Sequence, residues 1–538
     1  MKFLRRFVTF WALFALTAIA VISLDSHRSL STDPSQVQSA QINGSPQKLA
    51  LLPDYSRDID CFATANHYQI EAKLRLEQGN AVIQGLQNVR YTNHSPNPLQ
   101  EVVFRLYPNI PSLQKTAQLQ VTATRLAGKP LTSTLSSNNT VLTVQLPTPL
   151  PPSQSVELDL EFVTQIRQNQ RGASFGRMGY IDDVITAGSW YPALSVYEAQ
   201  RGWWVTSIPA PITDATGNVE SDSDPTYTET SLFEVKLTVP RSLAVISNGV
   251  QVNRQTNTDG TVTYHSITGP MREQVWVASS RYEKTQAEVD GVKLNIWYYR
   301  DRANANSRST RNALELTQKS LVAFNQQFGA YPYRELQVVQ NPVSTGLEFP
   351  GLVLINSNAW NKTAIQRLVV HEVAHQWFYG LVGNNQVEHP WLDEGLATYA
   401  ERVYQLFYAD AKTAEKLNRY AQQSIKEFDQ AIATGNLPDL RLNLPVADFK
   451  EFYGLFAYKR GSDFYIQLEQ QLGQAAVYQA LRQYVQQHRY EIATIRDPKA
   501  ALEQASGKKL DEVYAKWIGS YQKDDKPATA RVCQSAPS

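Results

Sequence analysis

The sequence predicts an α+β protein, with a β region followed by a mainly helical region. Two observations indicate the β region: residues 68–76 and 156–162 alternate apolar and polar side chains, and Gly, Asn and Asp punctuate many similar runs between Asp54 and Asp301. From Ala303 onward, apolar residues recur at helical spacing. Runs of strands followed by runs of helices are typical of the α+β class.

Length and charge narrow the classes of protein that fit. The chain has 538 residues, of which 42% are apolar, so two or three domains with sizeable cores are expected. The formal net charge is only +1, and nothing in this balance indicates nucleic-acid binding. We divide the chain into a targeting segment (1–24), a linker (25–53), a β domain (54–301), a helical domain (302–522) and a tail (523–538).

The first 24 residues indicate export. Lys2, Arg5 and Arg6 precede an uncharged run, residues 7–24, which fits a secretory signal or a signal anchor. Residues 18–20 (A-I-A) offer a cleavage site, but a run of this length is also just able to span a bilayer at about 1.5 Å per residue. We favour cleavage slightly. In either case the folded protein is extracytoplasmic: secreted, periplasmic, or tethered to a membrane by residues 7–24 and facing outward.

A linker, two cysteines and a polar insertion also allow structural predictions. Residues 25–53 are rich in Ser, Gln and Pro, which is typical of a disordered tether. Cys61 and Cys533 either join the tail to the first domain or remain two unpaired surface thiols. Residues 201–230 form a polar insertion that contains Trp203, Trp204, Asp222 and Asp224. This insertion either faces a substrate or is a solvated excursion, and we expect the solvated excursion.

The helical region begins with a helix over 311–327, followed by short strands at 335–340 and 352–356. Thr363-Ala364-Ile365-Gln366 then resembles a capping box, and apolar residues at helical spacing continue to Trp377. Gly380 is placed to close this helix in a left-handed turn. Amphipathic helices are expected from about Thr413 to Tyr521.

The helix over 363–380 carries the most informative motif, His371-Glu372-Val373-Ala374-His375, which we expect mid-helix. Histidines four positions apart project from one face, so both can reach a single metal ion beside Glu372. H-E-x-x-H alone also occurs by chance on amphipathic helices. Three of the chain's 8 histidines, however, lie within residues 371–389, and Glu394 follows His375 at the spacing of a third ligand.

A second helix, entered through a turn at Pro390, would bring Glu394 back to the two histidines. Two histidines and one carboxylate leave zinc a fourth position for water, as in catalytic sites. The sequence therefore predicts one zinc ion held by His371, His375 and Glu394, with Glu372 as the base. His389 precedes Pro390 in the turn, and we exclude it as a ligand.

These motifs resemble the gluzincin aminopeptidase family, which includes aminopeptidase N and the leukotriene hydrolases. The segments H-E-V-A-H-Q-W (371–377) and W-L-D-E-G-L-A-T-Y-A-E (391–401) are similar to the family's zinc motif. Residues 344–350 (S-T-G-L-E-F-P) are similar to the exopeptidase motif G-x-M-E-N, and Tyr458-Lys459-Arg460-Gly461 is similar to Y-x-K-G. Residues 91–95 and 189–192 resemble parts of the family's β-saddle.

The resemblance implies a β-saddle domain followed by a thermolysin-like catalytic domain. It also implies that Glu348, next to Gly346 in the substrate-binding segment, holds the free α-amine of a peptide, and that Tyr458 stabilises the tetrahedral intermediate. Larger members continue into a β-sandwich and a helical cap, so we expect a more open cleft here, or one closed by an oligomeric partner. The expected function is release of N-terminal residues from peptides that have a free N-terminus.

Two alternatives remain open from the sequence. Thr345 and Phe349 depart from the usual exopeptidase motif, which favours a zinc endopeptidase of the same fold. A non-catalytic, membrane-associated binding protein on the same fold is disfavoured, because such proteins usually lose a ligand or the base. All five residues that this chemistry needs are present: His371, Glu372, His375, Glu394 and Tyr458.

Overall fold

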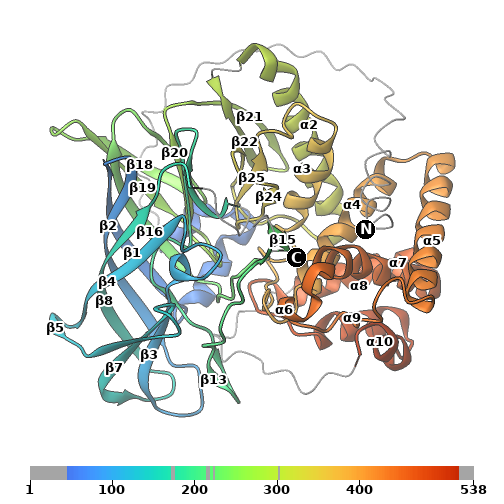
Figure 1. The fold of residues 1–538 in the computed structure, drawn as a ribbon, viewed down its shortest axis with the longest axis horizontal. Coiled ribbons are helices and arrows are strands. Elements are labelled where there is room, and N and C mark those ends of the chain that lie inside the picture. Colours follow the sequence, from blue (N-terminus) through green and yellow to red (C-terminus); the bar gives the residue numbers. More distant parts are fainter. Residues whose placement is uncertain (1–44, 171–175, 214–218, 222–223, 301–302, 520–538) are drawn as a thin grey trace.

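The computed structural model describes residues 45–170, 176–213, 219–221, 224–300 and 303–519. Most strands occupy one side of the molecule and most helices the other (Figure 1). The predicted α+β class is confirmed. The targeting segment, most of the linker and the tail lie outside the described residues.

The largest sheet has eight strands in the order β18-β19-β16-β1-β2-β8-β4-β5. Neighbouring strands pair antiparallel, except that β1 and β16 are parallel. Both predicted alternating runs lie in this sheet, in β1 and β8, and their side chains alternate in burial. The strands are β1 (His67–Glu77), β2 (Asn80–Thr92), β4 (Ala117–Leu126), β5 (Lys129–Pro130), β8 (Ser155–Ile166), β16 (Leu232–Pro240), β18 (Val250–Thr256) and β19 (Thr261–Ile267).

Smaller sheets complete the β region, in the orders β17-β20-β10-β9, β11-β3-β7-β6, β12-β13 and β14-β15. An aromatic core that includes Trp190 and Trp276 joins the large sheet to these smaller ones. The elements are β3 (Leu99–Arg105), η4 (Tyr107–Asn109), β6 (Ser133–Ser136), β7 (Val141–Leu150), β9 (Met178–Ile181), β10 (Val184–Gly188), β11 (Ala193–Leu194), β12 (Tyr197–Glu198), β13 (Gly202–Trp203), β14 (Ile212–Thr213), β15 (Val219–Ser221), β17 (Ala244–Ser247) and β20 (Val275–Ser279).

A five-stranded mixed sheet, β21-β22-β23-β25-β24, begins the second half of the molecule. The two strands predicted at 335–340 and 352–356 are confirmed as β23 and β25. This sheet spans the predicted domain boundary, because β21 and β22 precede residue 301. Its strands are β21 (Tyr282–Val289), β22 (Val292–Tyr299), β23 (Glu335–Asn341), β24 (Gly346–Leu347) and β25 (Leu352–Asn356).

Helices pack around this sheet and share one large core with it. The first, α2, begins eight residues earlier than the helix predicted at 311–327. The helices are α2 (Ala303–Phe328), α3 (Ala364–Ala374), α4 (Trp391–Tyr408), α5 (Ala411–Ala433), α6 (Val446–Phe449), α7 (Gly461–Leu472), α8 (Gln474–His488), α9 (Arg496–Ser506) and α10 (Asp511–Trp517), with the 3-10 helices η2 (Pro46–Ala50), η3 (Pro53–Phe62) and η7 (Lys450–Phe452) and the π-helix η8 (Gly454–Arg460).

The end of the expected tether is folded. Leu51 is completely buried, and the backbone N–H of Leu52 donates to the carbonyl of Pro332 at 2.8 Å. Residues 46–53 therefore belong to the folded body, because their apolar side chains join its core. Cys61 is disulfide-bonded, and Cys533 lies outside the described residues. No helix in the part of the chain that the structure describes is both long and apolar enough to cross a membrane.

The polar insertion at 201–230 is partly exposed, at residues 205–207 for example, and partly buried against the body. Trp204 is 2% exposed and packs edge-on against Tyr227, which is equally buried. Asp224 is 4% exposed and pairs with a buried arginine. Burial of two aromatic rings holds this segment against the body, so the prediction of a solvated excursion is wrong for this buried part. Asp222 lies outside the described residues.

Candidate metal centre

The helix α3 presents the histidine motif at its C-terminal end. His371 and Glu372 lie in its last turn and His375 caps it, so the predicted mid-helix position is wrong. Thr363 makes no side-chain cap hydrogen bond, and the expected capping box does not form. After His375 the helical turn becomes wider than in an α-helix. The backbone N–H groups of Gly380, Leu381 and Val382 each donate to a carbonyl five residues earlier.

The left-handed turn predicted at Gly380 falls instead on Tyr379, whose φ is 118°. A bulky residue in this region is strained unless its surroundings hold it. Here the Tyr379 N–H donates to the carbonyl of Val382, and its own carbonyl accepts from Arg272 Nε at 2.9 Å. Hydrogen bonds to both the N–H and the C=O of Tyr379 therefore fix the turn.

The helix α4 returns Glu394 to the two histidines. His371 Nε2 lies 3.1 Å from His375 Nε2 and 3.1 Å from Glu394 Oε2, and His375 Nε2 lies 3.3 Å from the same oxygen. A tetrahedral zinc site with bonds of about 2.1 Å places its ligand atoms roughly 3.3–3.4 Å apart. The three atoms therefore fit one zinc ion, and all three residues are buried.

The second ring nitrogen, Nδ1, of each histidine has a hydrogen-bond partner. His371 Nδ1 lies 2.9 Å from Glu401 Oε1, and His375 Nδ1 lies 3.0 Å from the carbonyl of Phe378. Acceptors at Nδ1 fix the tautomer that leaves Nε2 free for a metal. The sequence analysis missed Glu401, although it lies seven positions after Glu394 on the same helix, a spacing that places both on one face.

Burial and charge shift the ionisation of this centre. Burial would lower the pKa of His371, but hydrogen bonds with Glu394 and Glu401 outweigh it and raise the pKa to about 9. Burial would raise the pKa of Glu394, yet the two histidines hold it well below its usual range. The centre therefore concentrates negative charge on Glu394, which suits a cation between the three residues.

Glu372 packs directly against the backbone of β24. A Cβ atom added to Gly346 would lie 2.0 Å from Glu372 Oε1, so any larger residue at 346 would displace this carboxylate. Burial raises the pKa of Glu372 to about 8. The structure thus brings predicted residues Gly346 and Glu372 together, and it gives Gly346 a steric reason to lack a side chain.

Tyr458 lies in the π-helix η8, a type of distortion that often occurs at functional sites. Its hydroxyl donates to Glu394 Oε1 at 2.6 Å, and its ring stacks on His371 with centroids 5.8 Å apart. Burial and the charge of Glu394 raise the pKa of this phenol well above its usual range. Tyr458 is therefore a neutral hydrogen-bond donor beside the metal ligands.

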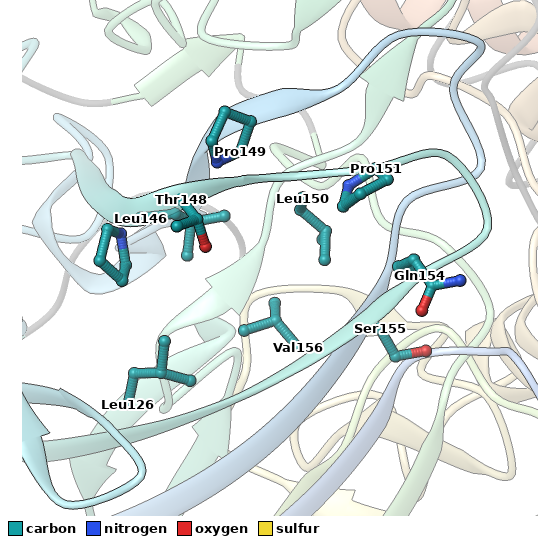
Figure 2. Close-up of a pocket in the computed structure, with 10 residues that line it drawn as sticks. Leu126, Leu146, Thr148, Pro149, Leu150, Pro151, Gln154, Ser155 and Val156 are labelled. Carbon is teal, nitrogen blue, oxygen red and sulfur yellow. The ribbon is translucent and has the colours of Figure 1, made fainter.

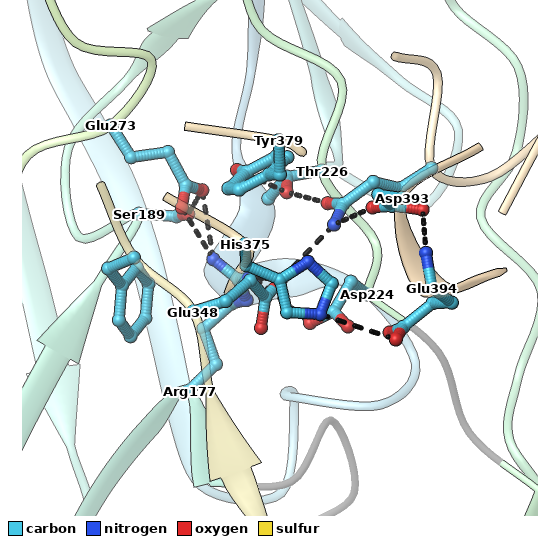
Figure 3. Close-up of polar contacts among 12 residues, drawn as sticks. Arg177, Ser189, Asp224, Thr226, Glu273, Glu348, His375, Tyr379, Asp393 and Glu394 are labelled. Atoms are coloured by element: carbon cyan, nitrogen blue, oxygen red, sulfur yellow. Dashed lines mark hydrogen bonds and ion pairs between the residues drawn. The ribbon is translucent and has the colours of Figure 1, made fainter. Parts of the chain in front are cut away.

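Glu348 lies in a buried charge cluster that we name the Arg177 cluster: Arg177, Asp224, Glu273 and Glu348 (Figure 3). Nη1 of Arg177 donates to both carboxylate oxygens of Glu273, at 2.9 and 2.8 Å. Nη2 lies 3.1 Å from Asp224 and 3.8 Å from Glu348. One guanidinium thus serves three carboxylates.

Comparison with known proteins agrees with this geometry. Residues 312–517 match the family model described as the peptidase family M1 domain. Residues 312–517 are therefore a peptidase family M1 domain. The chain is 26% identical over 313 residues to aminopeptidase M1-A of Oryza sativa subsp. japonica (53% of this chain, 34% of the relative), and 25% identical over 416 residues to the puromycin-sensitive aminopeptidase of Caenorhabditis elegans (73% and 40%). The chain spans between a third and two fifths of the length of these relatives.

Solved M1 structures share the fold. An M1 zinc metallopeptidase from Deinococcus radiodurans aligns with a TM-score of 0.58 and 19% identity, covering 86% of this chain and 96% of that one. A structure described as a two-domain M1 zinc metallopeptidase bound to L-tryptophan aligns with a TM-score of 0.59 over 86% of this chain and 96% of that one. This chain therefore shares the fold of these M1 structures over most of its length.

Gln386, which lies within the M1 domain, connects the metal half of the site to Glu348. Its Nε2 donates to Glu348 Oε1 at 3.1 Å and to Asp393 Oδ2 at 2.8 Å, and Asp393 Oδ1 accepts from the N–H of Glu394. Its Oε1 accepts a 2.6 Å hydrogen bond from Thr226, whose hydroxyl also meets that of Tyr379. Sequence reasoning missed Gln386, because no local pattern links it to Glu348.

Phe349, which departs from the usual M1 motif, is a buried support. The Arg177 guanidinium lies over its ring, with Cζ 4.6 Å from the ring centroid, which is a typical cation–π distance. The aromatic side chain at this position therefore helps to hold Arg177 beside Glu348.

A groove of about 530 Å³ at the end of the β region, between β7 and β8, is not part of the site (Figure 2). It is lined by Leu, Pro and Val with a few uncharged polar residues. No lining residue is titratable, so this groove offers no group for metal binding or proton transfer.

Proposed function

We propose that this chain is a zinc metallopeptidase that removes the N-terminal residue from peptides with a free N-terminus. One observation carries the proposal. A single nitrogen, Gln386 Nε2, donates both to Glu348 and to the neighbour of the metal ligand Glu394. One buried amide therefore links the expected amine-binding carboxylate to the residue next to a metal ligand.

His371, His375 and Glu394 would hold the zinc ion, which when bound supplies Lewis-acid chemistry that polarises a carbonyl and makes water more acidic. Glu372, buried against Gly346, accepts the proton of the attacking water and passes it to the leaving amine. This general-base and general-acid cycle is typically worth roughly 10²–10⁴-fold in rate.

Tyr458 and Glu348 act on opposite ends of the substrate's N-terminal residue. The Tyr458 hydroxyl, already a donor to Glu394, turns to the developing oxyanion, where one such donor is worth about 10²–10³-fold. Glu348 binds the substrate ammonium and so aligns the first peptide bond with the metal site. Related M1 structures from the same comparison are described as bound to Tyr-Ser-Ala and to L-tryptophan, which supports peptide and amino-acid ligands here.

Peptide digestion tests the proposal. We expect the zinc-loaded protein to shorten a free peptide one residue at a time from its N-terminus, with products followed by mass spectrometry. The N-acetylated form of the same peptide should remain nearly intact. Internal cleavage of both forms would instead establish the endopeptidase alternative, and no cleavage of either would favour a binding protein.

We further propose that the protein works outside the cytoplasm. Basic residues before the apolar run 7–24, and the disulfide at Cys61, support this location. Sequencing the N-terminus of the protein from its native host tests it. A mature chain that starts after residue 20, or an intact chain in the membrane fraction with its catalytic domain outside, is expected. An intact chain in the cytoplasmic fraction would contradict it.

A further inference from the structure

Arg272, a buried arginine just before β20, bonds backbone carbonyl groups on both sides of the boundary between the β region and the helical region. Its Nε donates to the carbonyl of Tyr379 at 2.9 Å, its Nη1 to that of Thr228 at 3.1 Å, and its Nη2 to that of Glu491. A buried cation is costly unless its donors are bonded. Arg272 therefore joins Thr228, in the β region, to two segments of the helical region.

The helical region leaves room for this guanidinium at Gly383. A Cβ atom added to Gly383 would lie 2.1 Å from Cζ of Arg272 and 2.2 Å from its Nε, so any larger residue would displace the arginine. The N–H of Gly383 also donates at 2.9 Å to the carbonyl of Glu491, which accepts from Arg272 as well. The close approach gives Gly383 a steric reason to lack a side chain.

Tyr379, whose carbonyl Arg272 holds, directly follows the carbonyl that orients His375. That carbonyl belongs to Phe378 and lies 3.0 Å from His375 Nδ1. The φ angle of Tyr379 describes rotation about its N–Cα bond, and this nitrogen shares a peptide unit with the Phe378 carbonyl. At 118° this φ is strained for a residue other than glycine. Relaxation of Tyr379 to an ordinary φ would rotate the Phe378 carbonyl away from His375.

We propose that Arg272 is a positioning residue for the zinc ligand His375. This inference rests on the metal centre of the proposed function. By holding the Tyr379 carbonyl, Arg272 keeps the strained turn and therefore keeps the Phe378 carbonyl at His375 Nδ1. Such hydrogen-bond partners fix the tautomer and orientation of a ligating imidazole, and their loss typically weakens metal binding by about 10–100-fold. Retention of zinc thus depends on a contact between the β region and the helical region.

Zinc release tests this inference without turnover. Arg272→Met keeps much of the side-chain volume but has no N–H donors. Transfer of zinc from the loaded protein to a chromophoric chelator, measured well below the unfolding temperature of each variant, should be faster than in wild type by about 10-fold or more. Gly383→Ala keeps Arg272 but displaces its guanidinium, so it should also accelerate release. This second variant covers the case in which Arg272→Met does not fold.

Cobalt substitution separates positioning from general destabilisation, because the visible absorption of Co²⁺ depends on the geometry of its ligands. Both variants should change the spectrum of the Co²⁺ protein. Arg105→Met is the matched control. Arg105 is also a completely buried arginine of the β region, but it stacks on Trp204 and has no hydrogen-bond partner among the residues that the structure describes. Arg105→Met should keep the spectrum and release zinc within about threefold of the wild-type rate.

The outcomes separate the two claims. A wild-type protein that retains no zinc would overturn the proposed function and this inference together. Unchanged zinc release and unchanged Co²⁺ spectra in both Arg272→Met and Gly383→Ala would overturn the role of Arg272 alone. Equal acceleration in Arg105→Met would show that the loss of any buried arginine loosens the metal centre, which also overturns the role of Arg272.

Discussion

The two halves of the site are built in different ways. The metal half takes His371, Glu372, His375 and Glu394 from two helices within 24 consecutive residues, and their mutual distances are close to those of a zinc site. The ammonium half, built around Glu348 as the proposed ammonium-binding residue, takes Arg177, Asp224, Glu273, Glu348 and Gln386 from five separate segments of the chain. Residue spacing along two helices positions the metal-binding side chains. The proposed substrate selection depends instead on how the two halves of the molecule pack.

Removing the base should have the largest effect, and it should act on the metal half alone. Glu372→Gln keeps a side chain of the same size against Gly346 but cannot accept the proton of water. We expect kcat to fall by at least about 10²–10⁴-fold, with zinc content by elemental analysis unchanged. Activity within about tenfold of wild type would remove Glu372 from the mechanism.

Removing the anchor should affect the ammonium half alone. Glu348→Ala should cost about 2–4 kcal/mol of transition-state binding for free-amine peptides, because it leaves the substrate charge poorly paired. N-acetylated peptides never make this contact and should be poor substrates of both forms. The ratio of kcat/KM between free and acetylated peptides is the measurement, and an unchanged ratio would show that Glu348 is not the anchor.

Tyr458→Phe should lower kcat by about 10²-fold and leave KM nearly unchanged, because the lost hydroxyl acts on the transition state. Tyr465→Phe is a matched control: its hydroxyl is buried in the core beside η8 and has no hydrogen-bond partner among the residues that the structure describes. Steady-state kinetics on one aminoacyl substrate distinguish the two. If KM rises in Tyr458→Phe while kcat holds, Tyr458 binds substrate instead.

The segment that supplies Asp224 should also give a smaller, pH-dependent effect on stability. Burial raises the pKa of Glu229 from 4.5 to about 7, against opposing contributions from Asn66 and Arg272. The folded state then binds this proton more tightly than the unfolded state, so the free energy of unfolding falls as pH rises from about 4.5 to 7. Because Glu229 keeps some exposure, we expect the free energy of unfolding to fall by about 1–2 kcal/mol, which is less than the pKa shift would give for a fully buried group.

Glu229→Gln should remove that part of the pH dependence and stabilise the fold above pH 7. Urea unfolding of both forms at pH 5 and pH 8 is the measurement. Equal pH dependence in wild type and variant would show that Glu229 does not carry it.

The same contrast between the two halves explains what the sequence could predict. Periodicity located β1, β8, β23 and β25 because alternation and short apolar runs are local properties of a strand. The ligands were predictable for the same reason, since residues four apart on a helix always share a face. Even there, the end of α3 was missed, because the hydrogen bonds of Tyr379 and Arg272 override the preference for glycine at Gly380.

The partners of Glu348 could not be predicted, because no local rule connects them. Asp224 lies in a polar stretch that is typical of exposed loops, and only the packing of Trp204 and Tyr227 shows that it turns inward. Gln386 lies between two helices, and nothing in the sequence indicates that its amide donates hydrogen bonds to Glu348 and Asp393. Glu348 itself was found through the family resemblance rather than through its chemistry.

Zinc content tests the central claim most directly. Protein purified without chelator should contain about one equivalent of zinc, lose its peptidase activity to phenanthroline, and regain activity when zinc is restored. His371→Ala and Glu394→Ala should each contain far less metal, because each removes one of three ligands. Less than about half an equivalent of zinc, with full activity in phenanthroline, would contradict the account.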